Sequence, residues 1–344
     1  MKNHKKSLLP TLLCCIAIAS FIISYSFAER CEAQTTQRVI SELSLSIPND
    51  IDEINYNDIC KLLIKQKQKE VIMKNYISQI HLTNNKDKVF ELYYSNLIGI
   101  CNLFNKLIWQ DEDVENSISS FNSQLNKGNP AFFGNVYGDE INKTYIRIMP
   151  TMKIEPVYKR KLIDTLNITY PQVPFIKMVY AGEGYFESSI NYKYINENYS
   201  SFLGKPLKDF ILLKQKEEKF LDGNAYYLDA TVSLSKKQLL DLIISWQKFR
   251  ENYPNFKQEE VTKTLKIYTS DFMCGSDNSF GFTFDYLDNR LLPEAKKAYE
   301  EFLSSVNPKT KEYNTVKTCY NILKEHKFKA TNEFFICVEN YENE

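Results

Sequence analysis

The chain has 344 residues, of which 43% are hydrophobic and 25% are charged, so it is apolar enough to fold around a substantial core. Its 43 basic and 43 acidic residues balance. This balance excludes the electrostatic footprint that a nucleic-acid-binding protein or a protein held on an anionic membrane carries.

Residues 1–28 have the pattern of a secretory signal peptide. Three lysines near the start precede an apolar run from Leu8 to Phe27, and Ser26 and Ala28 are the small residues that a signal peptidase reads. We expect residues 1–28 to be removed, leaving an exported (periplasmic or secreted) chain with no membrane attachment. Since the leader holds three of the basic residues and no acidic one, the mature net charge is −3. The alternative is an uncleaved anchor, because the run from Ser7 to Ala28 is long enough to cross a bilayer.

Residues 29–128 form a predicted N-terminal helical region. Apolar residues recur with helical periodicity from Tyr56 to His81 and again from Lys88 to Trp109, with Asn84-Asn85 between the two runs. These runs predict a helical hairpin. A third, polar helix is predicted from Asp111 to Asn126, because a glycine and a proline follow it as they often follow a helix end.

Residues 129–206 change in character and form a predicted mixed connector. Between Ala131 and Thr151, aromatic and β-branched residues lie among glycines and a proline, which indicates a short strand-containing or irregular segment. A helix is predicted from Val157 to Leu166, and a stretch dense in proline, glycine and tyrosine follows from Tyr170 to Tyr199. This connector is the expected boundary between two helical regions.

Residues 207–344 carry the most regular pattern and predict helical hairpins. Ser235, followed three residues later by Gln238, is a capping-box start for a helix that stops before Pro254. Further helices are predicted at residues 257–271, 293–305 and 313–325, with a loop around Gly275. The predicted fold class is therefore mainly α, with helical hairpins and a short strand-containing or irregular connector.

The two C-terminal hairpins repeat one design. The aligned pairs are Trp246 with Tyr299, Phe249 with Phe302, Pro254 with Pro308, Val261 with Val316, and Leu265 with Tyr320. An amphipathic hairpin buries its apolar face only against a neighbour, and stacked hairpins leave a concave surface suited to a partner. The sequence therefore predicts a repeat-like C-terminal region.

The run from Trp246 to Asn255, with its Trp-x-x-Phe and Tyr-Pro-Asn, resembles hairpins of the tetratricopeptide-like repeat proteins that bacteria export. The segment from Tyr180 to Ile336 is similar to bacterial exported proteins of unassigned function. The spacing between the two aligned C-terminal hairpins is longer than the period of a standard tetratricopeptide repeat. The resemblance implies a helical scaffold and carries over no functional residue.

Six cysteines remain after the expected cleavage, at positions 31, 60, 101, 274, 319 and 337. An even number in an exported chain permits disulfides, and proximity along the chain favours the pair Cys319 and Cys337. No CxxC pair occurs, and the mature chain would hold only His81 and His326, outside any metal-binding motif. We expect no metal and no other cofactor.

One enzymatic hypothesis is a serine acyl-enzyme. Ser233 and Lys236 fit the SxxK motif, Ser276-Asp277-Asn278 fits SDN, and Lys317-Thr318-Cys319 approaches the KTG that completes the set in penicillin-recognising enzymes. Cys319 stands where the third motif has glycine, and its lysine lies in a predicted helix. A helix cap at Ser235 and an Asx-type turn at residues 277–278 are the structural interpretation.

The other enzymatic hypothesis places two carboxylates in the connector. Glu183 lies between Gly182 and Gly184, and Glu187 follows four residues later. The pair would serve as acid and base in the cleavage of a glycan, with nearby tyrosines stacking on its sugars. The structural interpretation is a glycine-kinked turn whose aromatic side chains pack on the helices beneath it.

From the sequence we therefore favour an exported, non-catalytic scaffold that binds a protein or peptide partner in the cell envelope on a helical surface. The alternative is a hydrolase of cell wall or glycan that uses Glu183 and Glu187. Acyl-enzyme chemistry at Ser233 and Lys236 ranks below both.

Overall fold

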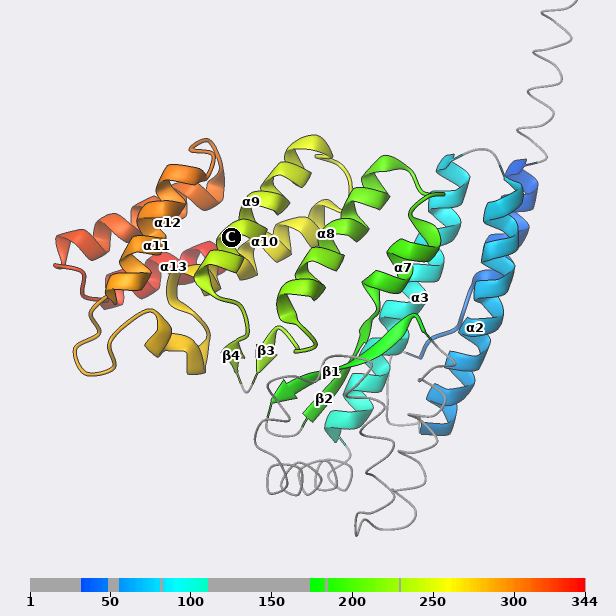
Figure 1. The fold of residues 1–344 in the computed structure, drawn as a ribbon, viewed down its shortest axis with the longest axis horizontal. Coiled ribbons are helices and arrows are strands. Elements are labelled where there is room, and N and C mark those ends of the chain that lie inside the picture. The colour runs from blue at the N-terminus through cyan, green and yellow to red at the C-terminus, as the bar shows by residue number, and fades with distance from the viewer. Residues whose placement is uncertain are drawn as a thin grey trace, which may run out of the picture.

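A computed structural model describes residues 32–48, 56–80, 83–110, 174–182, 185–228 and 230–343. These residues are mainly α-helical, which confirms the predicted fold class, and their strands form two small two-stranded sheets. The described helices stand in a row that runs from the N-terminal to the C-terminal part of the chain, with both sheets along one edge (Figure 1). The predicted signal peptide and the helices predicted at 111–126 and 157–166 lie outside the described residues.

The N-terminal hairpin is present. A short helix at residues 32–43 precedes α2 (Tyr56–Gln79) and α3 (Thr83–Gln110), which pack against each other. Asn84 and Asn85 do not separate the two helices as predicted, because they lie in the first turn of α3. Asparagine favours helix ends, so the pair marks the start of the second helix instead of a gap between helices.

The connector contains a β-hairpin that leans on α3. Strand β1 (Ile176–Gly182) pairs antiparallel with β2 (Tyr185–Ile190) from the Ile176–Ile190 pair up to a register shift near the turn. Ser188 is buried against α3, where its hydroxyl donates to the Cys101 carbonyl at 3.2 Å and its amide donates to Asn105 Oδ1 at 2.6 Å. The connector therefore contains strands, at residues 176–190, whereas the segment 131–151 where the strand-containing or irregular part is predicted lies outside the described residues.

Two helices that the sequence analysis does not predict come next, α7 (Tyr192–Tyr199) and α8 (Lys205–Leu221). Asn191 caps α7, and a proline in the first turn of α8 follows Gly204. Helix α8 ends where Asp222 and Gly223 both adopt positive φ, at 53° and 86°. The chain then forms the short hairpin of β3 (Tyr227–Leu228) and β4 (Thr231–Val232).

The C-terminal helices lie close to their predicted bounds. They are α9 (Lys236–Asn252), α10 (Gln258–Cys274), α11 (Pro293–Ser305) and α12 (Lys311–Glu325), with the 3₁₀ helix η2 (Asp277–Phe282) between the second and the third. Ser235 forms the predicted capping box with Gln238. A last helix that the sequence analysis does not predict, α13 (Asn332–Asn343), packs on α10 and α12.

One cluster of buried apolar side chains extends from Val39 to Tyr341 and joins both helical regions. Within it, the aligned apolar and aromatic positions of the two C-terminal hairpins, from Trp246 to Tyr320, are all buried. These positions are therefore core positions, and the repeat itself stays a prediction. Membership of the tetratricopeptide class stays a prediction.

Candidate functional site

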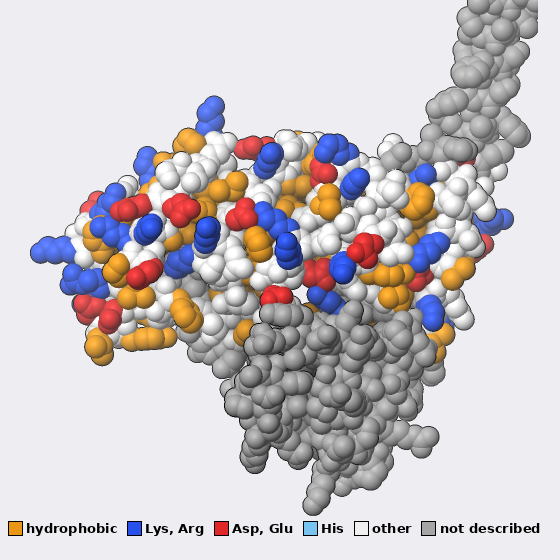
Figure 2. All heavy atoms as spheres, viewed as in Figure 1, with side chains coloured by type: hydrophobic (Ala, Val, Ile, Leu, Met, Phe, Trp, Pro, Cys, Tyr) orange, Lys and Arg blue, Asp and Glu red, His pale blue; other side chains and the backbone are white. Residues whose placement is uncertain are grey.

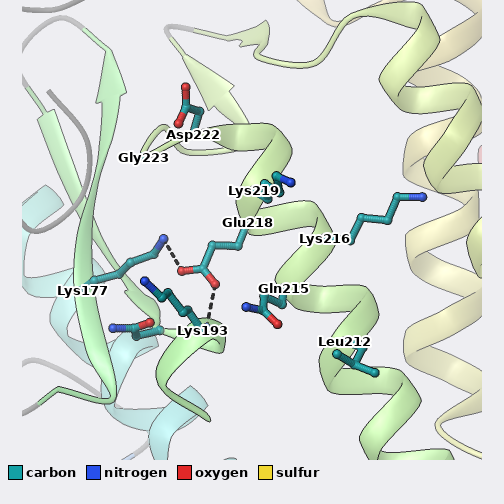
Figure 3. Close-up of a pocket in the computed structure, with 10 residues that line it drawn as sticks. Lys177, Lys193, Leu212, Gln215, Lys216, Glu218, Lys219, Asp222 and Gly223 are labelled. Atoms are coloured by element: carbon teal, nitrogen blue, oxygen red, sulfur yellow. Dashed lines mark hydrogen bonds and ion pairs between the residues drawn. The ribbon is translucent and has the colours of Figure 1, made fainter. Parts of the chain in front are cut away.

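A groove-shaped cavity of about 630 Å³ lies between α8 on one side and β1 and α7 on the other (Figure 3). Helix α8 supplies half of its lining residues, and the turn that ends α8 closes one end. The lining residues are Lys177, Asn191, Lys193, Leu212, Gln215, Lys216, Glu218, Lys219, Asp222 and Gly223. Its volume lies within the range of ligand-binding sites. We call this cavity the lysine groove.

Glu218 holds the walls of the lysine groove together. One carboxylate oxygen pairs with Lys177 Nζ at 2.5 Å, and the other accepts the Lys193 backbone N–H at 3.0 Å, as Figure 3 shows. The second contact lies in the first turn of α7, where the helix dipole favours a carboxylate. Since the ion pair is largely buried, with side chains 12% and 14% exposed, it fixes β1 and α7 against α8.

The remaining lysines leave positive charge at the groove. Lys216 pairs with Asp241 of α9 at 2.8 Å and donates to Ser245 Oγ at 2.9 Å. Lys193 and Lys219 are exposed, and neither ammonium forms an ion pair with any described residue. Leu212 adds an apolar surface, 41% exposed, at one end. The groove therefore combines a hydrophobic contact with two cations that no described carboxylate pairs.

Glu187 lies in a smaller cavity behind the Lys177–Glu218 ion pair, whose two residues line both cavities. Side chains alternate along β2, so the burial of Ser188 against α3 turns Glu187 away from that helix. This inner cavity has a volume of about 230 Å³, below the range of small-molecule sites, and a glycan chain needs more room. Glu183, the other predicted carboxylate, lies outside the described residues.

The inner cavity also contains a buried carboxylate that the sequence analysis does not identify. Glu217 of α8 accepts the Trp246 indole N–H at 2.6 Å and pairs with Lys214 at 3.3 Å. The indole bond ties α8 to α9, and the lysine lies on α8 itself, so Glu217 has a structural role. The sequence feature that could have identified Glu217 is the presence of an acidic residue on an otherwise apolar helix face.

Two of the three serine-enzyme motifs are brought together. The Ser276 hydroxyl donates to the Ala230 carbonyl, and the Val232 amide donates to Ser279 Oγ at 2.7 Å, so the loop after α10 lies against β4. The hydroxyl of Ser233 donates to the Ala225 carbonyl at 2.6 Å, and no hydrogen bond joins it to Lys236. The side chains of residues 277 and 278 lie outside the described residues.

The Lys236 amine donates to the Phe272 carbonyl at 2.7 Å. Burial of the amine lowers the pKa of Lys236 from 10.5 to about 8, against a smaller opposing effect of the nearby Cys274 and Asp271. A lysine with a lowered pKa is a common feature of catalytic sites. The same lowering also results when a lysine is buried against a helix end. Here the Lys236 amine and the Ser233 hydroxyl each donate to a backbone carbonyl, which agrees with a structural role for both residues.

The third motif lies elsewhere. Lys317, Thr318 and Cys319 belong to α12, where Thr318 donates back to the Asn314 carbonyl. Cys319 is bonded to Cys337 of α13 in the disulfide that the sequence predicts. A helix fixed by a disulfide cannot present the edge strand that this motif supplies in penicillin-recognising enzymes.

Hydrophobic side chains gather on the loop between η2 and α11 (Figure 2). Leu287 is 96% exposed, and Phe282 and Tyr286 are each 69% exposed. Phe335 of α13 is also exposed, and its ring lies 6.2 Å from that of Phe280. Contiguous exposed apolar residues of this kind often mark a contact surface.

The described residues contain no cluster of three or more histidine, cysteine, aspartate or glutamate side chains that would hold a metal ion. Among the described helices, none is both long enough and apolar enough to span a membrane. The chain matches no known family model, no curated protein and no solved structure.

Proposed function

We propose that the protein is an exported, non-catalytic scaffold that binds an acidic segment of a protein partner in the lysine groove. The observation that carries the proposal is the pair of exposed lysines, Lys193 and Lys219, which form no ion pair with any described residue and lie beside the exposed side chain of Leu212. Carboxylates of a partner would meet the two ammonium groups, and an apolar side chain would cover the leucine. The predicted signal peptide at the N-terminus supports export of the protein. The exposed apolar residues around Leu287 offer the same partner additional contact area.

The rigidity of the groove supports a binding role. Asn191 caps α7 by accepting the Tyr194 amide at 3.0 Å and also donates to the Pro174 carbonyl at 3.0 Å. Asn196 of α7 donates to Gln215 of α8 at 2.8 Å. With the Lys177–Glu218 pair, these bonds hold the walls in place before a partner arrives, which reduces the ordering cost of association.

A charge-reversal experiment tests the proposal. The tagged full-length chain is expressed in the cells that make it, and proteins captured after crosslinking are compared for the wild type and for the Lys193→Glu/Lys219→Glu variant. A matched control, Lys248→Glu/Lys297→Glu, reverses two exposed lysines on α9 and α11 that have no ion pair with any described residue. We expect one partner to be captured by the wild type and the control and lost at least tenfold in the groove variant. Equal capture by all three chains would contradict the proposal.

A hydrolysis assay tests the alternative function, a hydrolase of cell wall or glycan. The purified mature chain is incubated with cell-wall and glycan substrates, and release of sugar or peptide is measured for the wild type and for Glu187→Gln. Hydrolysis that disappears in Glu187→Gln would replace the scaffold proposal with the hydrolase. No hydrolysis, together with a charge-dependent partner, is the result that the scaffold predicts.

A further inference from the structure

A second cavity, of about 820 Å³, lies along the face of α10 that meets β3 and the end of α13. Helix α10 supplies most of its lining residues, and Tyr227 and Glu342 complete the wall from the other two elements. The Lys266 amine donates to the Glu342 carbonyl at 3.3 Å, which ties α10 to α13 at this point. The cavity shares no lining residue with the lysine groove.

Asp271 contributes a buried carboxylate to this cavity, with only 6% of the residue exposed. The Tyr226 and Tyr227 hydroxyls both donate to its Oδ2, at 2.7 and 2.9 Å. Among the described residues, Lys236 is the cation whose charge acts to lower the pKa of Asp271. Its amine does not bond this carboxylate and donates to the Phe272 carbonyl. A buried carboxylate without a directly paired cation is costly, so the site favours a positive group close to the second oxygen.

Ser270, the preceding residue, lines the same cavity and is also 6% exposed. Its hydroxyl has no hydrogen-bond partner in the described structure. Leaving a buried hydroxyl unpaired destabilises the folded chain. A ligand that bonds this hydroxyl would recover that free energy, so the unpaired oxygen points to a polar occupant.

The other lining groups favour a cation over an anion. Glu259 and Glu342 add two carboxylates at the rim, against two lysines, Lys263 and Lys266, so the cavity is net acidic when Asp271 is ionised. Tyr227 is 42% exposed and presents an aromatic ring, the type of surface on which an ammonium group binds favourably.

We propose that this cavity binds a small ligand through a protonated primary amine, with Asp271 as its counter-ion and Ser270 as a hydrogen-bond partner. The ammonium group occupies the position next to Asp271 Oδ1, while Tyr226 and Tyr227 hold Oδ2. The alkyl part of the ligand lies along Ile267 and the Tyr227 ring.

A ligand titration with three probes of the same size tests the site. Butylammonium, 1-butanol and butyrate are titrated against the full-length mature protein at constant pH and ionic strength, and binding is followed by nuclear magnetic resonance. We expect butylammonium to bind at least tenfold more tightly than 1-butanol and butyrate not to bind. Equal binding of butylammonium and 1-butanol would show a merely apolar cavity and overturn the proposal, as would failure of butylammonium to bind.

Two variants and a control locate the binding. Asp271→Asn removes the charge and should weaken butylammonium at least tenfold. Ser270→Ala removes only an unpaired hydroxyl, so the protein should fold as the wild type does and bind butylammonium several-fold more weakly. Asp285→Asn changes an exposed carboxylate in the loop between η2 and α11 and should leave binding unchanged. Wild-type affinity in both Ser270→Ala and a folded Asp271→Asn would place the ammonium site elsewhere and refute the assignment.

Discussion

The disulfide between Cys319 and Cys337 gives the sharpest stability prediction. It joins α12 to α13 with a Cα–Cα distance of 5.9 Å and spans a sequence separation of 18 residues. In the chain-entropy description, closing a loop of this length removes about 11 cal/mol/K from the unfolded ensemble, which corresponds to about 3 kcal/mol at about 25 °C. Opening the loop should therefore lower the free energy of unfolding by about 3 kcal/mol.

Urea unfolding followed by circular dichroism measures this difference. The samples are the oxidised wild type, the wild type reduced with a phosphine, and Cys319→Ala/Cys337→Ala. With a slope of about 3 kcal/mol/M, the reduced protein should unfold at a urea concentration about 1 M lower than the oxidised protein. The double variant should lie near the reduced protein, slightly lower because Cys319 is fully buried and its truncation also removes contacts.

Cys274 provides the control, since it is a free cysteine that is only partly buried. Cys274→Ala should keep the dependence of the midpoint on reductant. If the fully reduced wild type unfolds at the same urea concentration as the oxidised protein, the loop-closure reasoning is wrong.

Three further predictions concern other parts of the fold. Arg250→Ala should lower the free energy of unfolding by about 3–5 kcal/mol in urea titrations, because it leaves Glu312 buried without the two bonds of 2.9 and 2.7 Å that it now accepts. Arg290→Ala, in an exposed pair, should cost less than about 1 kcal/mol, and equal losses would contradict the argument. Between pH 8 and 10.5, Lys236 itself should bind fewer protons in the folded chain than in the unfolded chain, because burial lowers its pKa from 10.5 to about 8. Stability relative to Lys236→Met should therefore rise with pH across that window, by about 3 kcal/mol in parallel urea titrations, and a flat difference would refute it. Leu287→Asp should change the free energy of unfolding by less than about 0.5 kcal/mol, because the side chain is 96% exposed. The same variant should bind less of a hydrophobic dye than the wild type. A large loss of stability would show that the loop packs differently.

The helix bounds that the sequence predicts correctly are those with local signals. Ser235 and Gln238 form the capping box that begins α9, and Pro293 stands in the first turn of α11. Helix α8 has a proline in its first turn as α11 does, and α13 follows Thr331, a residue type that often caps helices, so a local start signal alone does not decide the prediction. The apolar faces of both helices pack on neighbouring helices, which is information that a local pattern does not hold.

The disulfide was predictable because proximity along the chain coincides with proximity in space. The lysine groove was not, since Lys177 and Glu218 lie far apart along the chain and meet only when the β-hairpin leans on α3 and α8. The Asp271 cavity depends in the same way on Tyr226 and Tyr227 folding back over α10. A carboxylate on a helix carries no sequence signal that tells which distant hydroxyls will surround it.

A site-specific crosslink in the lysine groove tests the central proposal most directly. A photoreactive residue replaces Leu212 in the full-length chain, adducts formed in living cells are digested, and the crosslinked partner peptide is sequenced. The scaffold proposal predicts one partner segment rich in aspartate or glutamate, lost when Lys193→Glu/Lys219→Glu is added and kept with Lys248→Glu/Lys297→Glu. Adducts that are absent, or that are unchanged by reversing the two groove lysines, would contradict it.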